Sequence, residues 1–291
     1  MPNKKKKEIL LLFIIPALVF YLIFWIAPVL MSFFYGLTDW NGLGDANYVG
    51  FDNFKFLFKD GTLSNAMKNT VVYALVVVIW GNVQALALAL LLNMKLKARG
   101  AFRTIFYIPA LFSTIVVAFI WSYVYAPYYG MLYEVLGKIG IGQNLNLLGS
   151  TGTALIAVAF VETWKTSGTM TIIYLAGLQS IPEEVMESAR IDGCTAWQST
   201  AKVKIPMLAN TITINVMLGL INGFKSFDYV FALTGGGPGT SSGTLMYTIY
   251  KMAFMEGQFG KAEALAAFAF IFILLISVIA LTIMKRKEIE A

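Results

Sequence analysis

The sequence has no histidine and only one cysteine, Cys194, among 291 residues. Without histidine, the chain cannot use an imidazole as a general acid or base, and it cannot build a metal site with histidine ligands. A single thiol cannot form an internal disulfide or a thiolate metal cluster. The sequence therefore predicts no cofactor, no metal and no enzymatic chemistry within the chain.

Charged residues are also scarce. They make up 13% of the chain, whereas hydrophobic residues make up 58%, and the mean hydropathy is +0.71. This composition is typical of an integral membrane protein and excludes a water-soluble domain of this size. The net charge of +6 does not indicate a nucleic-acid partner, because the basic residues gather at the ends of apolar segments instead of forming one face.

Long apolar segments dominate the sequence. A helix of about 20 apolar residues crosses the ~30 Å hydrocarbon core of a bilayer. We predict an all-α membrane protein with six transmembrane helices, at about residues 9–34, 70–92, 104–125, 153–175, 207–227 and 262–284. One membrane domain, 9–284, lies between short tails, 1–8 and 285–291. The first segment is too long for the apolar part of a signal peptide, so we expect it to be retained.

The distribution of basic residues predicts the orientation. In a six-span arrangement most of them fall on one side of the membrane: Lys4, Lys5, Lys6, Lys7, Lys95, Lys97, Arg99, Arg103, Lys285, Arg286 and Lys287. Basic loops face the cytoplasm, so both termini are predicted to be cytoplasmic. Trp40 with Tyr35, and Trp121 with Tyr123 and Tyr125, are expected as aromatic anchors in contact with lipid at the outer interface.

A dense polar block, residues 180–206, interrupts the apolar sequence on the predicted cytoplasmic side. Ser180 and Glu183 have the spacing of a capping box, with Pro182 in the first turn, so a helix is predicted to begin here. Asp192-Gly193 is a turn signal that should end this helix, with Gly193 in a left-handed conformation.

A second short helix is predicted in the same block. Thr195 and Gln198 repeat the capping-box spacing, and the helix should run toward Pro206. Two short helices joined by a turn form a compact projection, which we call the coupling segment (residues 180–206). An ordinary amphipathic cytoplasmic loop is the alternative interpretation.

The coupling segment resembles the EAA loop of permease subunits from binding-protein-dependent ABC importers. Glu187-Ser188-Ala189 matches the E-A-A motif, Asp192-Gly193 matches the following D-G, and Ile205-Pro206 stands where L-P is usual. In that family the loop seats in a cleft of the separate ATPase and transmits its motion. The resemblance implies these ATPase-docking residues: Glu187, Ser188, Ala189, Arg190, Asp192 and Gly193.

Other stretches are similar to the sugar permeases of the maltose type, in the same order along the chain. They lie at residues 48–54, 99–109, 176–182 and 233–238. This resemblance implies a second permease subunit in a heterodimer, two ATPase subunits, an extracytoplasmic sugar-binding protein and alternating access. It also implies multi-pass insertion in contact with membrane lipid, in the inner (cytoplasmic) membrane of a bacterial-type cell.

A glycine-rich stretch lies in the predicted fifth outer loop: Gly235, Gly236, Gly237 and Pro238, followed by Gly239. A phosphate-binding loop of the Walker type needs a following Gly-Lys-Ser/Thr and a strand-to-helix context, and both are missing here. The chain offers no Walker loop elsewhere, so ATP would be hydrolysed by a partner. We expect the four residues Gly235–Pro238 to contact the docked binding protein.

Polar residues inside the predicted spans mark a candidate substrate path. Ionisable side chains at this depth are costly and usually face the interior of a helix bundle. The candidate path residues are Glu162, Trp164, Lys165, Thr211, Asn215 and Asn222. Glu162 and Lys165 are three residues apart and could form an ion pair. Alternatively, this set joins helices to each other, as Gly219 and Gly223 in a GxxxG pattern do.

The sequence therefore predicts the permease subunit of an ATP-driven ABC importer. It would form half of the translocation path for a mono- or oligosaccharide or a related polyol, delivered by the extracytoplasmic binding protein. Two other classes stay open: a proton-coupled secondary transporter with Glu162 as the titrating site, and a membrane anchor that transports nothing.

Overall fold

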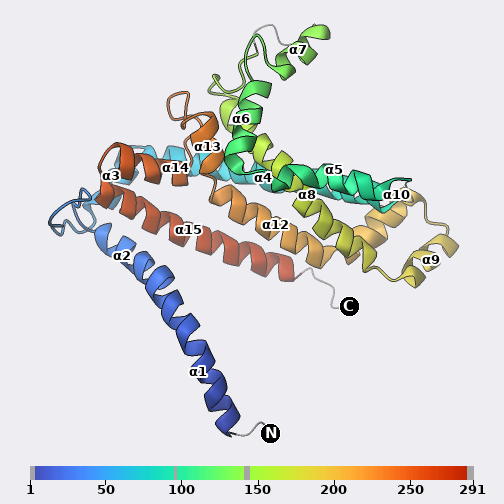
Figure 1. Cartoon of the computed structure of the whole chain (residues 1–291), viewed down its shortest axis with the longest axis horizontal. Coiled ribbons are helices and arrows are strands. Elements are labelled where there is room, and N and C mark those ends of the chain that lie inside the picture. The colour runs from blue at the N-terminus through green and yellow to red at the C-terminus, as the bar shows by residue number, and fades with distance from the viewer. Residues whose placement is uncertain (1–3, 95–96, 141–144, 287–291) are drawn as a thin grey trace. The chain divides into compact units, whose positions relative to one another are not determined.

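The computed structural model describes residues 4–94, 97–140 and 145–286, and it is nearly all helical (Figure 1). Within these ranges there is no strand; Thr38 and Tyr48 form one isolated antiparallel bridge. The α-helices are α1 (Lys4–Tyr21), α2 (Ala27–Tyr35), α3 (Asp52–Lys59), α4 (Thr62–Asn93), α5 (Arg99–Leu111), α6 (Thr114–Val124), α7 (Met131–Lys138), α8 (Ala154–Gln179), α9 (Glu183–Ile191), α10 (Ala196–Ser199), α11 (Ile205–Met207), α12 (Ala209–Phe224), α13 (Asp228–Leu233), α14 (Leu245–Tyr250) and α15 (Phe259–Lys285). Three π-helical turns, η1 (Leu22–Ile26), η2 (Thr200–Lys204) and η3 (Lys251–Met255), connect some of them. The predicted all-α class is confirmed.

Three helical segments are long and apolar enough to cross a membrane: Phe13–Tyr35, Thr62–Asn93 and Phe259–Lys285. The count rises to five if each of two bent helix pairs is one span. Helix α8 has 26 residues but lies outside this set. The polar residues between Glu162 and Thr171 lower its hydropathy. The number of six spans stays a prediction.

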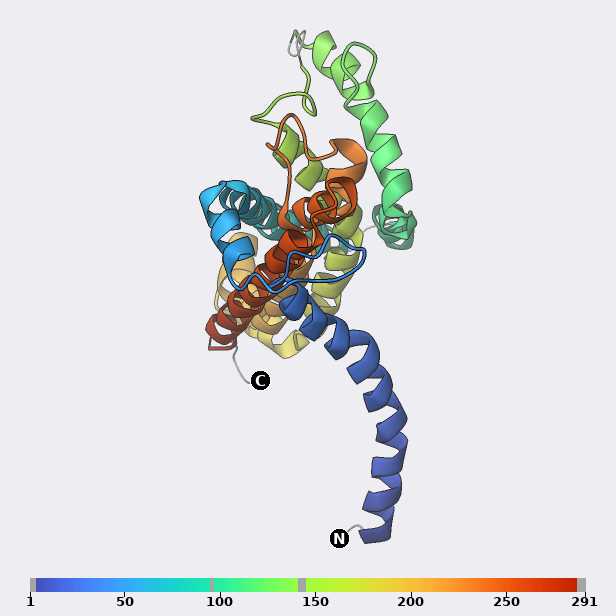
Figure 2. The same cartoon turned by 90° about the vertical axis from the view of Figure 1, so that its left-hand side faces the viewer.

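The predicted third span, 104–125, is wrong as one continuous helix. Helices α5 and α6 meet at an angle of 101°, which Figure 2 shows clearly. Phe112 is extended (φ −74°, ψ 147°), and Ser113 begins the next helix by accepting a hydrogen bond from the Val116 amide. A capping serine after an extended residue starts a new helix in a new direction. The fifth predicted span is bent by 71° before Ala209.

The chain divides into two compact units. The first contains the residues up to Leu63 together with Thr248–Ile271. Within it α2 packs against the start of α15: the Ser32 hydroxyl donates to Glu263 at 2.5 Å, and a Cβ on Gly36 would lie 3.0 Å from the Ala264 backbone. Tyr35 stacks on Trp40 at 4.4 Å, so these two predicted anchors form one aromatic cluster.

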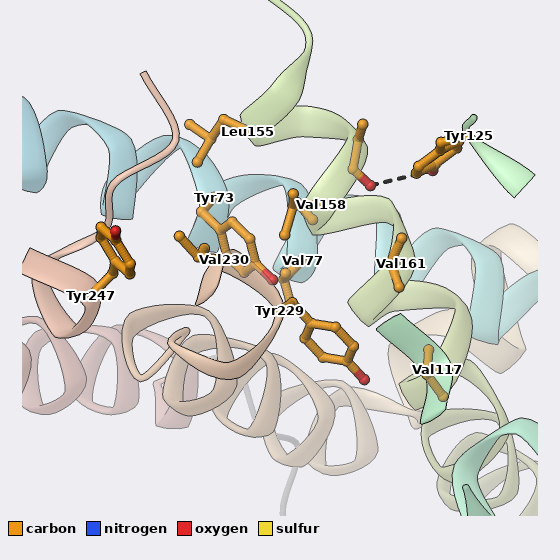
Figure 3. Packing of buried hydrophobic residues seen from close by; sticks show 12 residues of the cluster. Tyr73, Val77, Val117, Tyr125, Leu155, Val158, Val161, Tyr229, Val230 and Tyr247 are labelled. Carbon is orange, nitrogen blue, oxygen red and sulfur yellow. Dashed lines mark hydrogen bonds between the residues drawn. The ribbon is translucent and has the colours of Figure 1, made fainter. Parts of the chain in front are cut away.

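The second unit contains Ser64–Tyr247 and the chain from Phe272 onward, and its core is shown in Figure 3. Tyr73 and Val77 of α4 pack with Val158 and Val161 of α8 in a cluster of buried side chains. Tyr125 is only 8% exposed and its hydroxyl donates to the Ala157 carbonyl at 3.3 Å. The prediction that Tyr125 is a lipid-facing anchor is therefore wrong, because the hydroxyl has a buried partner in α8.

Small residues let helices of the second unit approach closely. A Cβ on Gly223 of α12 would lie 2.6 Å from the Ala74 Cα, and one on Gly219 would lie 3.3 Å from the Val78 Cα. The GxxxG pattern thus forms the contact between α12 and α4, as is common in membranes. Helix α5 lies along α8 (Figure 1), where Gly168 leaves room for the Phe106 carbonyl.

Candidate functional site

A polar cavity of about 380 Å³ lies in the second unit, between α6, α8 and the end of α12. Its size is within the usual range for small-molecule sites, ~300–1,000 Å³. The residues that line it are Thr114, Glu162, Lys165, Thr166, Ile221, Asn222, Lys225, Ser226, Phe227, Asp228 and Tyr229. It offers carboxyl, ammonium, amide and hydroxyl groups beside two aromatic rings, which is a set suited to a polyhydroxyl ligand.

Glu162 lines the cavity from α8 but is only 6% exposed. Its carboxyl oxygen Oε2 accepts a hydrogen bond of 2.6 Å from the hydroxyl of Tyr73, a fully buried residue of α4. Glu162 and Lys165, both described, form no ion pair, so that prediction is wrong. The spacing places both side chains on one face of α8, but Tyr73 from another helix reaches the carboxyl group instead.

Half of the candidate path residues line this cavity: Glu162, Lys165 and Asn222. Trp164 lies outside it and faces an apolar cavity of about 440 Å³, where its ring meets that of Trp121 at 5.6 Å. The other two, Thr211 and Asn215, pack α12 against α8.

Asn215 is fully buried and its amide nitrogen donates to the Met170 carbonyl at 3.2 Å. The Thr211 hydroxyl lies 2.3 Å from the place where a Cβ on Gly177 would stand. Both side chains therefore join two helices, which is the alternative that the sequence left open for this set.

The sequence did not single out Lys225, Asp228 or Tyr229 as cavity residues. The run Lys225-Ser226-Phe227-Asp228 stands where α12 ends and α13 begins. Two charges in four residues at the end of a span were a usable signal. The fifth span was predicted to end at Phe227, and charges at the end of a span are expected to face water. For this reason these two charges were not assigned to a cavity.

The glycine-rich loop is folded and packed. The Tyr247 hydroxyl donates to the Gly235 carbonyl at 2.5 Å, and a Cβ on Gly236 would lie 2.2 Å from the Tyr247 ring. The Ser242 hydroxyl donates to the Gly237 carbonyl at 2.6 Å. Gly236 is buried, Gly237 and Pro238 are half-buried, and Gly235 is exposed. These hydrogen bonds hold the loop in one conformation, with Gly235 on its exposed side.

The coupling segment contains the predicted helix, turn and second helix. Helix α9 ends at Ile191 with Asp192 as its C-cap, and the next residue, Gly193, has φ +76°. The Cys194 amide donates back to the Ala189 carbonyl at 3.0 Å, so the left-handed end of the helix is confirmed. The capping box of Thr195 and Gln198 at α10 is also confirmed, with both hydrogen bonds present.

The first predicted capping box is wrong. Ser180 ends α8, where its hydroxyl donates to the Gly177 carbonyl at 2.8 Å. Pro182 is the residue before α9 and not part of its first turn, and it has no capping side chain. Helix α8 continues to Gln179, so Ser180 is its C-cap and does not also cap the next helix.

One face of the coupling segment is not covered by other parts of the second unit. Glu187, Ser188, Arg190, Asp192 and Gly193 are exposed, and Ala189 is buried. Two large apolar side chains that the sequence did not single out are also exposed there: Ile191 at 81% and Trp197 at 76%. An exposed isoleucine and tryptophan beside acids are typical of a surface that binds another protein.

The end of α8 is fixed to α5 just before the coupling segment begins. With its side-chain oxygen turned toward α5, Gln179 accepts hydrogen bonds from Arg99 at 3.0 Å and Arg103 at 2.8 Å. Arg99 also donates to the Asn93 side chain at 3.2 Å. These contacts join α4, α5 and α8 at one end.

The glycine-rich loop and the coupling segment lie at opposite ends of α4. The Asn69 side chain donates to the Thr240 and Gly243 carbonyls at 2.9 and 3.0 Å. Leu90, 21 residues further along α4, lines a cavity with the coupling segment. At ~1.5 Å per residue this separation is about 32 Å, close to the ~30 Å hydrocarbon thickness of a bilayer.

The sequence model of the family described as "Binding-protein-dependent transport system inner membrane component" matches residues 81–287. The chain belongs to this family of ABC permeases. It is 36% identical to the multiple sugar-binding transport system permease protein MsmF of Streptococcus mutans, over 95% of each chain. It is 31% identical to the trehalose/maltose transport system permease protein MalF of Thermococcus litoralis, over 95% of this chain and 94% of that one. The resemblance inferred from the motifs is thus confirmed.

The fold matches that of a solved ABC permease. A chain of a bacterial ABC transporter involved in the import of alginate, an acidic polysaccharide, superposes with a TM-score of 0.83 at 25% identity, covering 97% of this chain and 96% of that one. A second structure shows an alginate transporter in complex with a pentasaccharide-bound periplasmic protein, with a TM-score of 0.82. The inner-membrane, multi-pass class of the permease family therefore applies to this chain.

Proposed function

We propose that this permease forms half of the translocation path of an ATP-driven importer for a mono- or oligosaccharide or a related polyol. The observation that carries the proposal is the polar cavity. It brings together two acids, two lysines, an asparagine and several hydroxyls. Glu162 and Lys165 lie in the middle of α8, where ionisable residues of a membrane protein are usually functional. The relatives MsmF and MalF, whose names specify sugars, support the carbohydrate class.

The position of the cavity supports entry of the sugar from the glycine-rich side. Tyr73 lies one helical turn from Asn69, which holds the glycine-rich loop. Glu162 lies 17 residues, about 26 Å along α8, from Gln179 at the coupling segment. We assign the glycine-rich loop to the outer surface, facing the sugar-binding protein, and the coupling segment to the cytoplasm, together with both termini.

The coupling segment is proposed to bind one of two ATPase subunits. Glu187 and the exposed Ile191 and Trp197 give this face both an acid and apolar anchors. A second, related permease chain would supply the other half of the path. ATP binding between the ATPase subunits would then move the coupling segment, and α8 with it.

The experiment is uptake by the assembled importer in proteoliposomes, with the binding protein loaded with labelled oligosaccharides. Uptake should require ATP inside the vesicle and should fall at least tenfold with Asn222→Leu, which removes a hydrogen-bonding group from the cavity. Thr169→Leu, an exposed position of α8 outside the cavity, is the matched control. Uptake by this chain alone that an uncoupler abolishes would instead establish a proton-coupled carrier. Absence of any uptake with a stable complex would favour an anchor.

A further inference from the structure

A second polar cavity lies between the end of α4 and the coupling segment, away from the substrate cavity. Its volume is about 470 Å³. One side is apolar and comes from Leu90 and Leu91 of α4 and from Met94, just after the end of that helix. The other side belongs to the coupling segment and carries Arg190 and Lys204, beside two hydroxyl side chains. The cavity thus has an apolar half and a cationic half.

The two cationic groups are not neutralised. No acidic side chain lines this cavity. Among the described residues, ion pairs occur only at Lys55–Asp52 and Lys251–Glu256, so neither Arg190 nor Lys204 is in one. An uncompensated pair of cations at one site favours an anion, and arginine with lysine is the combination that proteins use for phosphate.

The apolar half extends the same site toward the membrane. Leu91, in the last turn of the membrane-spanning helix α4, and Met94, just after its end at Asn93, are 56% and 58% exposed. At the end of a span these side chains meet the acyl chains just below the headgroups. A ligand with a phosphate and a hydrocarbon chain therefore matches both halves at once.

We propose that this cavity binds an anionic phospholipid, with its phosphate between Arg190 and Lys204 and the start of its acyl chain against Leu90, Leu91 and Met94. The cytoplasmic placement of the site rests on the proposed function, because the orientation is taken from the coupling segment. An acidic side chain of a partner protein would pair with the two cations but would leave the apolar side of the cavity exposed. The bound lipid would connect the last turn of α4 with the segment that the ATPase moves.

Cys194, the single cysteine of the chain, lines the cavity and is half-buried, which makes it a native probe. The assembled importer is placed in nanodiscs of phosphatidylcholine with increasing phosphatidylglycerol, and the rate of maleimide addition to Cys194 is measured. We expect the rate to fall as phosphatidylglycerol is added. Glycerol phosphate in solution should not change it, because it lacks the acyl chain.

Lys204→Gln should raise the phosphatidylglycerol fraction that halves the labelling rate by about fivefold, the effect of one lysine charge near an anionic lipid. The control is Lys202→Gln, an exposed lysine two residues away that does not line the cavity and should leave the lipid dependence unchanged. Each rate is divided by that of the same variant in pure phosphatidylcholine, which removes any direct effect on thiol reactivity.

Four results would overturn the proposal. They are equal rates in both lipids, equal effects of the two lysine changes, protection by glycerol phosphate alone, and protection in all lipids that appears only when the ATPase is present. The last result would assign the cavity to the protein partner. These readouts do not depend on sugar uptake, so a failed lipid test leaves the proposed function standing. A failed uptake test likewise leaves the lipid test intact.

Discussion

The hydrogen bond from Tyr73 to Glu162 gives the sharpest stability prediction. Tyr73→Phe keeps the buried ring and removes only the hydroxyl that donates to the Glu162 carboxyl group at 2.6 Å. Because Tyr73 is fully buried and Glu162 is 6% exposed, water cannot easily replace the donor. We expect a loss of about 2 kcal/mol of unfolding free energy, the range for hydrogen bonds to charged groups. This loss is about a thirtyfold change in the unfolding equilibrium.

The matched control is Tyr174→Phe. The Tyr174 hydroxyl is also bonded to another helix, at 2.6 Å, but its acceptor is the neutral Asn82 side chain. Its loss should cost about 1 kcal/mol, half of the effect at Tyr73. Both values can be measured by detergent-induced unfolding of the purified chain, with linear extrapolation to zero denaturant.

A double-mutant cycle then tests which residue is the partner of Glu162. Tyr73→Phe and Glu162→Gln should be coupled by about 1 kcal/mol, because a neutral amide accepts a weaker bond. Lys165→Met and Glu162→Gln should be coupled more weakly, since the two charges attract each other across the cavity but form no ion pair. Strong coupling with Lys165 and none with Tyr73 would refute the geometry described for this site.

Three further predictions concern the two functional surfaces. Gly236→Ala should lower uptake while basal ATPase activity of the assembled importer persists, because the added Cβ would meet the Tyr247 ring at 2.2 Å. Gly239→Ala is the control and should be far milder, because Gly239 also has a positive φ but has open space around it. Gly193→Val should weaken co-purification of the ATPase, because a valine at φ +76° strains the backbone by about 1–2 kcal/mol. Gly193→Asn should retain co-purification, since asparagine tolerates this φ and no atom lies within 4 Å of the added Cβ. Glu187→Ala should reduce ATPase binding at least fivefold in a pull-down titration. Glu184→Ala should not, because Glu184 lies in the first turn of α9, where stabilisation by the helix dipole is sufficient to explain an acid. Equal losses would contradict the assignment of Glu187.

The coupling segment was well predicted from the sequence because its signals are local. The hydroxyl of Thr195 and the amide of Gln198 complete a capping box within four residues. Gly193 determines the end of α9 through its own backbone conformation. The exception, Ser180, shows the limit of local reasoning. Its spacing to Glu183 fits a capping box, but the preceding helix runs one turn further than predicted and uses the serine first.

The residues of the polar cavity were only partly predicted because non-local contacts form it. Hydrophobic spacing identified Glu162 and Asn222 as polar positions within spans, but it could not show which face each helix turns to its neighbours. Asn215 is as polar as Asn222, and seven residues separate them, which is about two helical turns and hence the same face. The difference lies in the neighbours: Asn215 donates to the Met170 carbonyl of α8, whereas Asn222 lines the cavity together with Glu162 and Lys165 of that helix.

The bend at Ser113 is what opens the cavity at that place. If α5 and α6 formed one straight span beside α8, the close contact at Gly168 would continue along α8 and cover Lys165 and Glu162. Instead α6 leaves at 101°, and its first residue, Thr114, forms one wall of the cavity. The same helix α5 is held to Gln179 at the other end by Arg99 and Arg103. If an ATPase moves the coupling segment, as we propose, we expect the movement to act on α5 and α8 together and to reach the cavity through the wall that Thr114 forms.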